Sequence, residues 1–275
     1  MKIPFQNTVD IKTGHRIFRN PDFSYSVSSR MAGNEVDILT YLRLLYIYLD
    51  LSQISTVFGS TTEPCDFYGG RVYSPEASLS DVQIEVLNSR NIGLSLTLTN
   101  HYYSRELYDA NLPFLEKYHR KGNVIICTSD DLARMIRKDF PLYSLRASII
   151  KNLNTLEKVK KAFGLYDDVV IPMDMNDDDE FLEGLPGKDR IMLFANAACA
   201  YTCPARTCYA AISKYNRRLV TGKSCTKERQ GTLDQGNYFF NVEKFHQMGF
   251  SSFKLIPVLL DSLTGPANSK IDNKK

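Results

Sequence analysis

The stretch Gly93-Leu-Ser-Leu-Thr-Leu-Thr99 alternates apolar and polar residues, and it predicts a β-strand that ends at Asn100. Apolar residues then recur at helical spacing through 107–118, and Gly122 ends this predicted helix. The apolar stretch Asn123–Cys127 follows and predicts a second strand. A strand, a helix and a strand in this order are typical of two parallel strands joined by a crossover helix.

The same alternation continues on both sides of this unit. The other predicted strands lie at 54–58, 143–147, 168–172, 190–195 and 252–256. The other predicted helices lie at 35–51, 78–90, 129–136, 155–163, 176–185 and 242–248. Repeats of roughly 25 to 35 residues favour a parallel sheet with right-handed crossovers. We therefore predict an α/β fold of the TIM type, a (β/α)8 barrel that is complete or slightly incomplete or distorted. A doubly wound open sheet is the alternative, but no Gly-x-Gly-x-x-Gly fingerprint follows a predicted strand.

We divide the chain into three predicted parts. Residues 1–35 are polar and rich in turn formers, and we expect an irregular or short-strand lead-in there. Residues 36–262 are expected to form the barrel, with a cysteine-rich segment at 199–225. Residues 263–275 are expected to be a flexible tail. A chain of 275 residues is long enough for one barrel with a sizeable core.

The composition is that of an ordinary globular protein, with 43% hydrophobic and 24% charged residues. The formal net charge of +3 is too small to argue for nucleic-acid binding by itself. No run approaches the ~18 apolar residues of a membrane-spanning helix, and the stretch Met1–Asn7 lacks the apolar core of a signal peptide. We therefore expect a cytoplasmic protein with no membrane span. In a reducing compartment, cysteines are metal ligands or free thiols more often than disulfides.

Four of the six cysteines follow one predicted strand, with the spacing Cys199-x3-Cys203-x4-Cys208-x16-Cys225. Four thiolates can hold an iron-sulfur cluster or a tetrahedral zinc ion. The spacing lacks the Cys-x2-Cys pairs of a zinc ribbon, which favours iron-sulfur over zinc. Unligated thiols that fill space are the third interpretation. The remaining cysteines, Cys65 and Cys127, are interpreted as a loop thiol and a buried strand thiol.

Polar residues follow most of the predicted strands, and in a parallel barrel the carboxyl ends of the strands form the active face. The residues expected at that face are Gly69, Gly70, Arg71, Asn100, His101, Thr128–Asp130, Arg146, Ser148, Asp174, Asn176, Asn196 and Lys254. From these we select Asn100, Arg146 and Asp174 as candidate catalytic residues. A role as a helix cap would explain an asparagine at position 100 equally well. Arg206, inside the cysteine segment, is a fourth candidate, since its cation could balance an anionic substrate or a thiolate-rich cluster.

Several of these features occur in an order that is shared with a known family. They are Asn100 after a strand, Cys199-x8-Cys208 with Arg206 before Cys208, Ser213, Cys225 and Gly249-Phe-Ser-Ser-Phe-Lys-Leu255. Over roughly residues 50–256 this order resembles the collagenase-like peptidase family U-thirty-two. The better understood members of that family look like iron-sulfur hydroxylation factors that act on transfer RNA, ribosomal RNA or the ubiquinone ring.

The resemblance implies a barrel with a [4Fe-4S] cluster on Cys199, Cys203, Cys208 and Cys225. It also implies a small-molecule or RNA substrate, and it leaves open a protein partner or a dimer, because some of these hydroxylation factors work as heterodimers. The chain departs from the family in two ways. No cysteine follows Cys225, so Cys203 has to be the fourth ligand, and the family's Lys-Ile-Glu-Gly-Arg reads Lys254-Leu-Ile-Pro-Val258 here.

The predicted function is therefore iron-sulfur-dependent oxidative or hydroxylating modification of an RNA base, a quinone or another small aromatic molecule. Two alternatives stay open. One is a zinc-stabilised barrel that binds without catalysis, and the other is a metal-free barrel enzyme that acts on a sugar or nucleotide. A radical SAM enzyme is disfavoured, because its cysteine loop has different spacing and follows the first strand of the barrel. Peptidase activity is not expected, since the sequence has neither Gly-x-Ser-x-Gly nor His-Glu-x-x-His.

Overall fold

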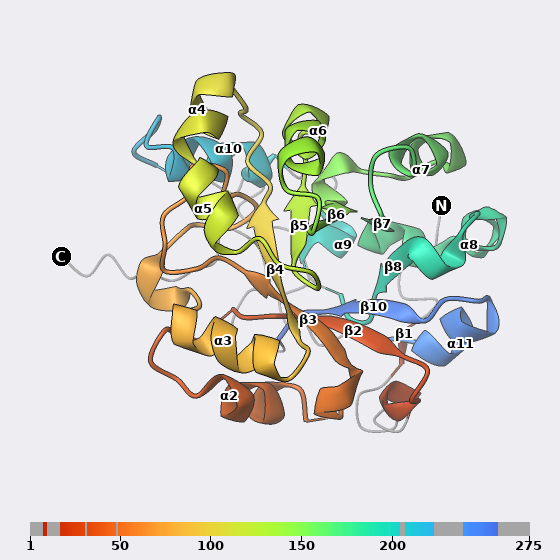
Figure 1. The fold of residues 1–275 in the computed structure, drawn as a ribbon. Coiled ribbons are helices and arrows are strands. Elements are labelled where there is room, and N and C mark those ends of the chain that lie inside the picture. Colours follow the sequence, from red (N-terminus) through yellow and green to blue (C-terminus); the bar gives the residue numbers. More distant parts are fainter. Residues whose placement is uncertain are drawn as a thin grey trace.

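The computed structural model of the chain describes residues 8–9, 17–30, 32–47, 49–197, 199–203, 207–222 and 239–257. These residues form a closed barrel in the strand order β10-β2-β3-β4-β5-β6-β7-β8 (Figure 1). Every neighbouring pair in the barrel is parallel, and β10 closes it by pairing with both β8 and β2. The predicted (β/α)8 TIM-type fold is confirmed, and the barrel is complete.

The eight barrel strands are short. They are β2 Ser24–Ser28, β3 Ile54–Gly59, β4 Gly93–Leu98, β5 Val124–Cys127, β6 Ser144–Ala147, β7 Asp168–Val170, β8 Ile191–Phe194 and β10 Ser252–Leu255. Seven of them lie at predicted strands, with ends that differ by one or two residues. The strand β2 lies instead in the part that was predicted as a lead-in.

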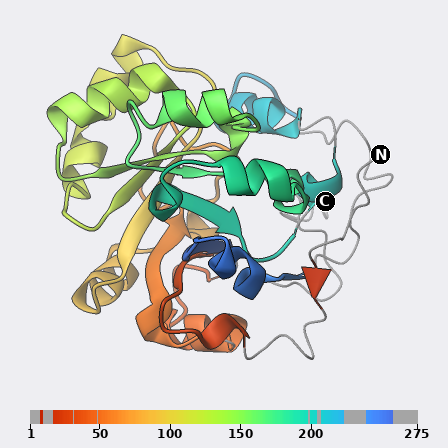
Figure 2. The ribbon, with the colours of Figure 1, turned by 90° about the vertical axis from the view of Figure 1, so that its right-hand side faces the viewer.

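Helices surround the barrel on its outside (Figures 1 and 2). They are α2 Ile38–Leu45, α3 Asp81–Ser89, α4 Arg105–Ala110, α5 Leu112–Lys117, α6 Asp130–Asp139, α7 Leu156–Ala162, α8 Asp179–Gly184 and α11 Val242–Gln247. Single 3-10 turns are η1 Ile17–Arg19, η2 Leu51–Gln53, η3 Pro75–Ala77, η4 Ile149–Lys151, η5 Met173–Asp177 and η6 Lys188–Arg190. None of the helices in the described ranges is long and apolar enough to cross a membrane.

The predicted helix over 107–118 is two helices in the structure. The first ends at Asn111, whose backbone N–H caps α4, and the second has Pro113 in its first turn. Proline has no N–H to donate, so it is tolerated in the first turn of a helix but not in its interior. The periodic apolar residues therefore continue across a break that Pro113 imposes.

The boundary predicted at residue 36 differs from the structure, because Ser24–Ser28 is the barrel strand β2. Its sequence Ser-Tyr-Ser-Val-Ser has no apolar run, yet Ser26 is fully buried. The Ser26 hydroxyl accepts hydrogen bonds from Thr56 and Arg146 across the barrel. Ser26 therefore has polar partners inside the barrel, which explains why this buried strand position is not apolar.

The interior of this barrel is polar along β4 as well. Thr97 and Thr99 line a cavity inside the mouth of the barrel, whereas Leu94, Leu96 and Leu98 are fully buried in the apolar core. Since successive side chains of a strand point to opposite faces, the leucines pack toward the helices. The alternation of the stretch 93–99 thus separates an apolar outer layer from a polar interior.

The segment between β8 and α11 reaches the mouth of the barrel, where its residues Ala200 and Tyr209 line the cavity. It contains α9 Cys199–Thr202, α10 Cys208–Asn216 and β9 Phe239–Phe240, and β9 pairs antiparallel with β1 Thr8–Val9. The helix α9 lies against η5, where Tyr201 hydrogen bonds Asp177, and α10 lies against the end of β4, where Asn100 donates to the carbonyl of Ser213. The two helices in the cysteine-rich segment were not predicted.

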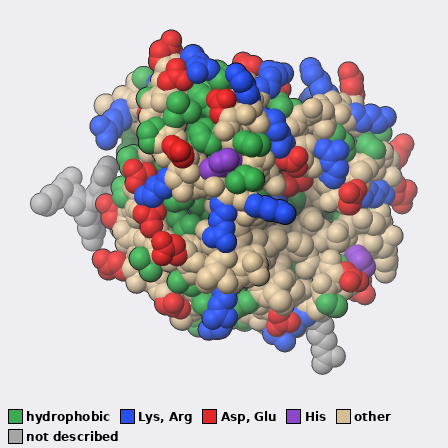
Figure 3. Space-filling view, viewed as in Figure 1, with side chains coloured by type: hydrophobic (Ala, Val, Ile, Leu, Met, Phe, Trp, Pro, Cys, Tyr) green, Lys and Arg blue, Asp and Glu red, His purple; other side chains and the backbone are tan. Residues whose placement is uncertain are grey.

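Acidic and basic side chains are interspersed on the face that Figure 3 shows. This mixed pattern agrees with the small formal net charge of +3.

Candidate functional site

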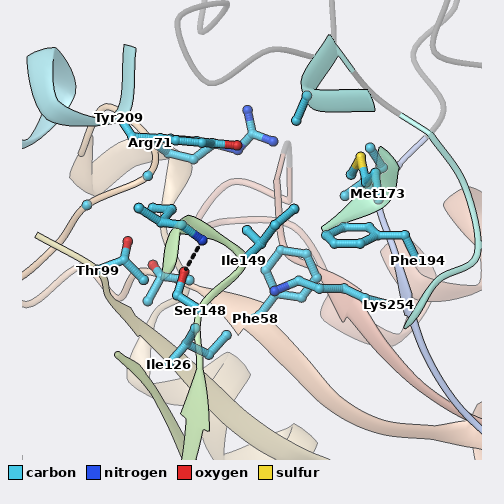
Figure 4. Close-up of a pocket in the computed structure, with 16 residues that line it drawn as sticks. Phe58, Arg71, Thr99, Ile126, Ser148, Ile149, Met173, Phe194, Tyr209 and Lys254 are labelled. Atoms are coloured by element: carbon cyan, nitrogen blue, oxygen red, sulfur yellow. Dashed lines mark hydrogen bonds between the residues drawn. The ribbon is translucent and has the colours of Figure 1, made fainter. Parts of the chain in front are cut away.

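A cavity of about 90 Å³ lies at the carboxyl ends of the barrel strands (Figure 4). Its lining residues come from β3, β4, β5, β8 and β10 and from the loops that follow the strands. They are Phe58, Gly69, Gly70, Arg71, Thr97, Thr99, Ile126, Ser148, Ile149, Ile150, Met173, Phe194, Ala200, Tyr209, Lys254 and Ile256. Five of the residues predicted at the active face are among them: Gly69, Gly70, Arg71, Ser148 and Lys254.

The amine of Lys254 lies in the cavity with aromatic neighbours. Lys254 is only 6% exposed, and its Nζ lies 4.0 Å from the ring centre of Phe58 and 6.0 Å from that of Phe194. Among the described residues, no hydrogen bond or ion pair reaches this amine. The ammonium form therefore loses its water of hydration without gaining a carboxylate in contact.

Burial lowers the pKa of Lys254 to about 7, and the positive charges of Arg146 and Arg71 add to this effect. The carboxylate of Asp168 acts in the opposite direction. A dehydrated cation beside two other cations favours its neutral form. At neutral pH, a large share of the Lys254 side chain is therefore an uncharged amine with a lone pair.

A second buried cation, Arg146 of β6, lies next to Asp168 of β7 in the register of the barrel. Arg146 Nε donates to one oxygen of the Asp168 carboxylate, and its Nη2 donates to the other at 3.1 Å. Its Nη1 donates to Ser26 Oγ at 3.3 Å. This two-pronged contact matches the guanidinium and carboxylate geometries and balances the charge of Arg146. Arg146 was predicted to be catalytic, but it does not line the cavity.

Two glycines allow the loop after β3 to reach the cavity. A Cβ on Gly69 would lie 2.5 Å from the backbone of Thr99 and Asn100, so only glycine fits against the end of β4. Gly70 has a φ of +73°, a conformation that favours glycine. The close approach of this loop brings Arg71 to the wall of the cavity.

The predicted catalytic residue Asn100 holds backbone segments together. Its Nδ2 donates to the carbonyls of Tyr68 at 3.2 Å and Ser213 at 3.1 Å, and its Oδ1 accepts from the N–H of Tyr102 at 3.0 Å. Asn100 is 1% exposed and does not line the cavity. These contacts join the loop after β3, the end of β4 and the helix α10.

Asn100 and Ser213 are both part of the order shared with the U-thirty-two family, and they are in contact in the structure. The neighbouring His101 has its Nδ1 at 2.9 Å from Ser213 Oγ, and burial lowers the pKa of His101. The Ser213 hydroxyl also donates to the carbonyl of Tyr209, and Ser213 is fully buried. A buried hydroxyl with two partners is poorly placed to attack a substrate.

Asp174, the third predicted catalytic residue, lies in η5 after β7. Its neighbour Met173 lines the cavity, whereas Asp174 does not. The 3-10 turn is fixed by Asn176, whose Nδ2 donates to the carbonyl of Phe194 at 2.9 Å, and by a hydrogen bond from Tyr201 of α9 to Asp177. Asp174 thus lies next to a cavity residue, in a turn that these hydrogen bonds hold in place.

The predicted cysteine cluster is only partly described. Cys203 is partly exposed and Cys208 is buried, while the side chain of Cys199 lies outside the described part of the structure. Arg206 and Cys225 also lie outside the described residues. Within the described ranges, no three residues among His, Cys, Asp and Glu are placed to hold a metal ion. The four-cysteine site therefore stays a prediction.

The two remaining cysteines lie where they were predicted. Cys65 is in the loop after β3, and Cys127 is buried at the end of β5. Burial raises the pKa of both thiols, that of Cys127 to about 12. Both are therefore protonated at neutral pH and are poor metal ligands.

The cavity contains the buried hydroxyl of Thr99. Thr99 is 3% exposed, and among the described residues no hydrogen bond reaches its Oγ1. Buried hydroxyls are usually hydrogen bonded, because burial without a partner costs free energy. An unpartnered hydroxyl next to empty space is typical of a position that a ligand or water occupies.

Sequence reasoning placed Lys254 at the active face but did not select it as catalytic. The signal was a single lysine in the apolar strand Ser252–Leu255, where a charged side chain is expensive to bury.

Comparison with known proteins gives a likeness to a solved structure. No protein-family model matches the chain, and no curated protein matches it. A solved structure described as the U32 peptidase Mk0906 superposes with a TM-score of 0.60 and 10% sequence identity. The match covers 87% of this chain and 94% of the other. The barrel is U32-like in fold. At this identity the likeness extends to the fold alone, and at that level the predicted resemblance is confirmed.

Proposed function

We propose that this protein is an enzyme whose active site is the cavity at the mouth of the barrel, and that it acts on a small molecule. The observation that carries the proposal is the buried amine of Lys254, which has no hydrogen-bond or ion-pair partner among the described residues. A protein that needs only stability gains nothing from such a group, because an apolar side chain of similar size packs there without the cost of dehydration.

Three further features support a catalytic site. The cavity lies at the carboxyl ends of parallel strands, where barrel enzymes carry their active sites. A lysine with a pKa near neutrality can act as a nucleophile or as a proton acceptor at physiological pH. The unpartnered Thr99 hydroxyl adds a donor and acceptor to the same wall. The described residues enclose only about 90 Å³, which suits a small substrate or one reactive end of a larger one.

Ligand-observed NMR tests the proposal with a panel of small probes: glycolate, inorganic phosphate and benzoate. We expect at least one of them to bind the wild-type protein and to lose binding in Ile149→Trp, which fills the cavity without changing Lys254. The control is Leu142→Trp, at an exposed position outside the cavity. If none of the probes binds, or if Ile149→Trp binds as well as the wild type, the cavity is not a substrate site.

A second candidate function is iron-sulfur-dependent oxidation or hydroxylation of an RNA base, a quinone or another small aromatic molecule. It is favoured by the position of the cysteine-rich segment, since Ala200 of α9 and Tyr209 of α10 both line the cavity. A cluster held by Cys199, Cys203, Cys208 and Cys225 would be close to a substrate bound there. When bound, such a cluster supplies electron transfer.

Metal analysis of protein purified without oxygen tests this second candidate. Cluster binding predicts visible absorption and about four irons per chain, both lost in Cys208→Ala. Cys127→Ala is the matched control, because Cys127 is a buried cysteine outside the segment. One zinc per chain without iron would favour the zinc-stabilised binding protein instead. Protein without bound metal would leave the metal-free enzyme as the function to pursue.

A further inference from the structure

Two sides of the cavity differ in their chemistry. Lys254 lies on one side, and Arg71 lies on the other. Figure 4 shows the Lys254 side chain extending beside the ring of Phe58, with Arg71 and Tyr209 across the space. Thr99 and Ser148 lie to the left of the Lys254 amine and below Arg71 in the same view. A ligand in the cavity would therefore have a neutral amine at one end and a guanidinium at the other.

Apolar groups surround the amine. Phe58, Ile126 and Phe194 line the cavity around it, and the amine contacts the face of Phe58. Nucleophilic attack needs the lone pair of the neutral amine, and a dehydrated, apolar environment is one in which lysine keeps that lone pair. Within the described residues no carboxylate contacts the amine, so none stabilises the ammonium form that lacks the lone pair.

We propose that Lys254 forms an imine with a small aldehyde or ketone that carries a carboxylate group. This inference rests on the proposed function, and it names the substrate class of the same cavity. The lone pair of Nζ attacks the carbonyl carbon, and the carbonyl π electrons move to oxygen. The two amine protons end on that oxygen, which leaves as water, and a C=N bond remains. The step needs neither an oxidant nor a reductant.

The charges around the cavity select the carboxylate. Arg71 lines the cavity, and guanidinium groups bind carboxylates through paired hydrogen bonds. The other cation nearby, Arg146, pairs with Asp168 and does not line the cavity. Thr99 Oγ1 can donate to the carbonyl oxygen as negative charge develops there.

The imine nitrogen can take up a proton from water to become a cation, and Phe58 lies where it stabilises that charge. The face of an aromatic ring attracts a cation, and this attraction is larger when water is excluded. The ring contact that Lys254 makes as an ammonium is kept when its nitrogen becomes an iminium.

Reductive trapping tests the inference on the full chain. The protein is incubated at pH 7 with glyoxylate and cyanoborohydride, which reduces an imine to a stable carboxymethyl group, and the modified lysines are located by peptide mapping. Lys151 is the internal control, because it is also largely buried, at 15% side-chain exposure, but is ion-paired with Asp130 at 2.7 Å. About half of Lys254 is neutral at pH 7, against about one in a few thousand for an ordinary lysine. We expect Lys254 to be modified at least about 100-fold faster than Lys151.

A second aldehyde and two variants test the roles of the carboxylate, Arg71 and Lys254 separately. Acetaldehyde has the carbonyl group without the carboxylate, and we expect it to modify Lys254 at least about 10-fold more slowly than glyoxylate. Arg71→Gln should remove most of this difference. Lys254→Arg should abolish the fast modification while the other lysines react as before, and the wild-type map remains decisive if that variant does not fold.

Three results would overturn the inference. Equal modification of Lys254 and Lys151 by glyoxylate would rule out an imine-forming lysine. If glycolate binds in the cavity while Lys254 is not trapped by glyoxylate, the proposed active site stands and the imine is refuted. Faster modification by acetaldehyde than by glyoxylate would refute the carboxylate-bearing substrate.

Discussion

Two buried cations lie in the interior of this barrel, and they differ in their partners. Arg146 has a carboxylate on the neighbouring strand that accepts two hydrogen bonds, so its charge is balanced where it lies. Lys254 has the face of Phe58 and a pKa lowered to about 7 by burial and by neighbouring cations. The comparison shows that burial alone does not decide the state of a cation. The carboxylate of Asp168 accepts two hydrogen bonds from Arg146, whereas no carboxylate among the described residues contacts Lys254, and burial lowers its pKa.

Asp168→Asn should have the largest effect, because it removes the partner of a buried guanidinium. We expect a loss of about 3–5 kcal/mol in the free energy of unfolding, the usual cost of breaking a buried ion pair. Urea unfolding measures this loss. The control is Arg134→Gln, which breaks the exposed pair with Asp131 and should cost less than about 1 kcal/mol. Equal effects of the two variants would mean that the Arg146 pair is no more important than a surface pair.

The pH dependence of stability should report the unpaired lysine. The pKa of Lys254 is about 7 in the folded protein and 10.5 when unperturbed. Between these pH values the unfolded chain binds more protons at this site, so stability rises with pH. The gain should approach about 1.4 kcal/mol per pH unit and should be absent below pH 7. The measurement is the difference in unfolding free energy between wild type and Lys254→Met from pH 6 to pH 9.5. A difference that does not change with pH would mean that Lys254 keeps an ordinary pKa.

Asn216→Ala should change the environment of Lys254 but not that of Arg146. Asn216 Nδ2 donates to the carbonyls of Tyr68 at 3.1 Å and Arg71 at 2.7 Å, and so fastens the loop after β3 to α10. Its loss should cost about 1–3 kcal/mol. Because Arg71 lowers the pKa of Lys254, a looser loop should raise the pH midpoint of Lys254 modification. An unchanged midpoint would show that the position of Arg71 does not depend on this contact. Lys158→Ala, at an exposed position on α7, is the control.

Ser26→Ala should have the smallest effect. The Ser26 hydroxyl accepts from Arg146 at 3.3 Å and from Thr56 at 2.8 Å, while the backbone of Ser26 pairs in register with Lys254. We expect a loss of about 0.5–1.5 kcal/mol and no change in the modification of Lys254. A shifted pH midpoint for Lys254 would show that the two cations are coupled through this serine.

Much of the fold could be predicted from local patterns. The strands β4, β5 and β8 are apolar or alternate regularly, and the helix α6 begins at Ser129, whose side chain caps it by accepting from the N–H of Leu132. These patterns depend on neighbours in the sequence, so they can be recognised without a structure. The strand β2 could not be recognised in this way. Its buried residue Ser26 has its hydrogen-bond partners, Arg146 and Thr56, far away in sequence.

The candidate site was predicted less completely. The sequence placed Gly69, Gly70, Arg71, Ser148 and Lys254 at the active face, and all five line the cavity. It also favoured Asn100 and Arg146 over Lys254 as catalytic residues. Their hydrogen bonds to Tyr68, Ser213 and Asp168 join parts of the chain that are up to 113 residues apart. A local pattern does not reveal such partners.

The sequence by itself determined the alternation of strands and helices, the glycines that permit the loop after β3, and the identities of the polar residues at the strand ends. Only the tertiary structure decided which of two buried cations has a carboxylate in contact. The register of the closed barrel puts Asp168 beside Arg146 and Phe194 beside Lys254. The strength of a charge interaction depends on distance and on exclusion of water, and both are fixed only when the barrel closes.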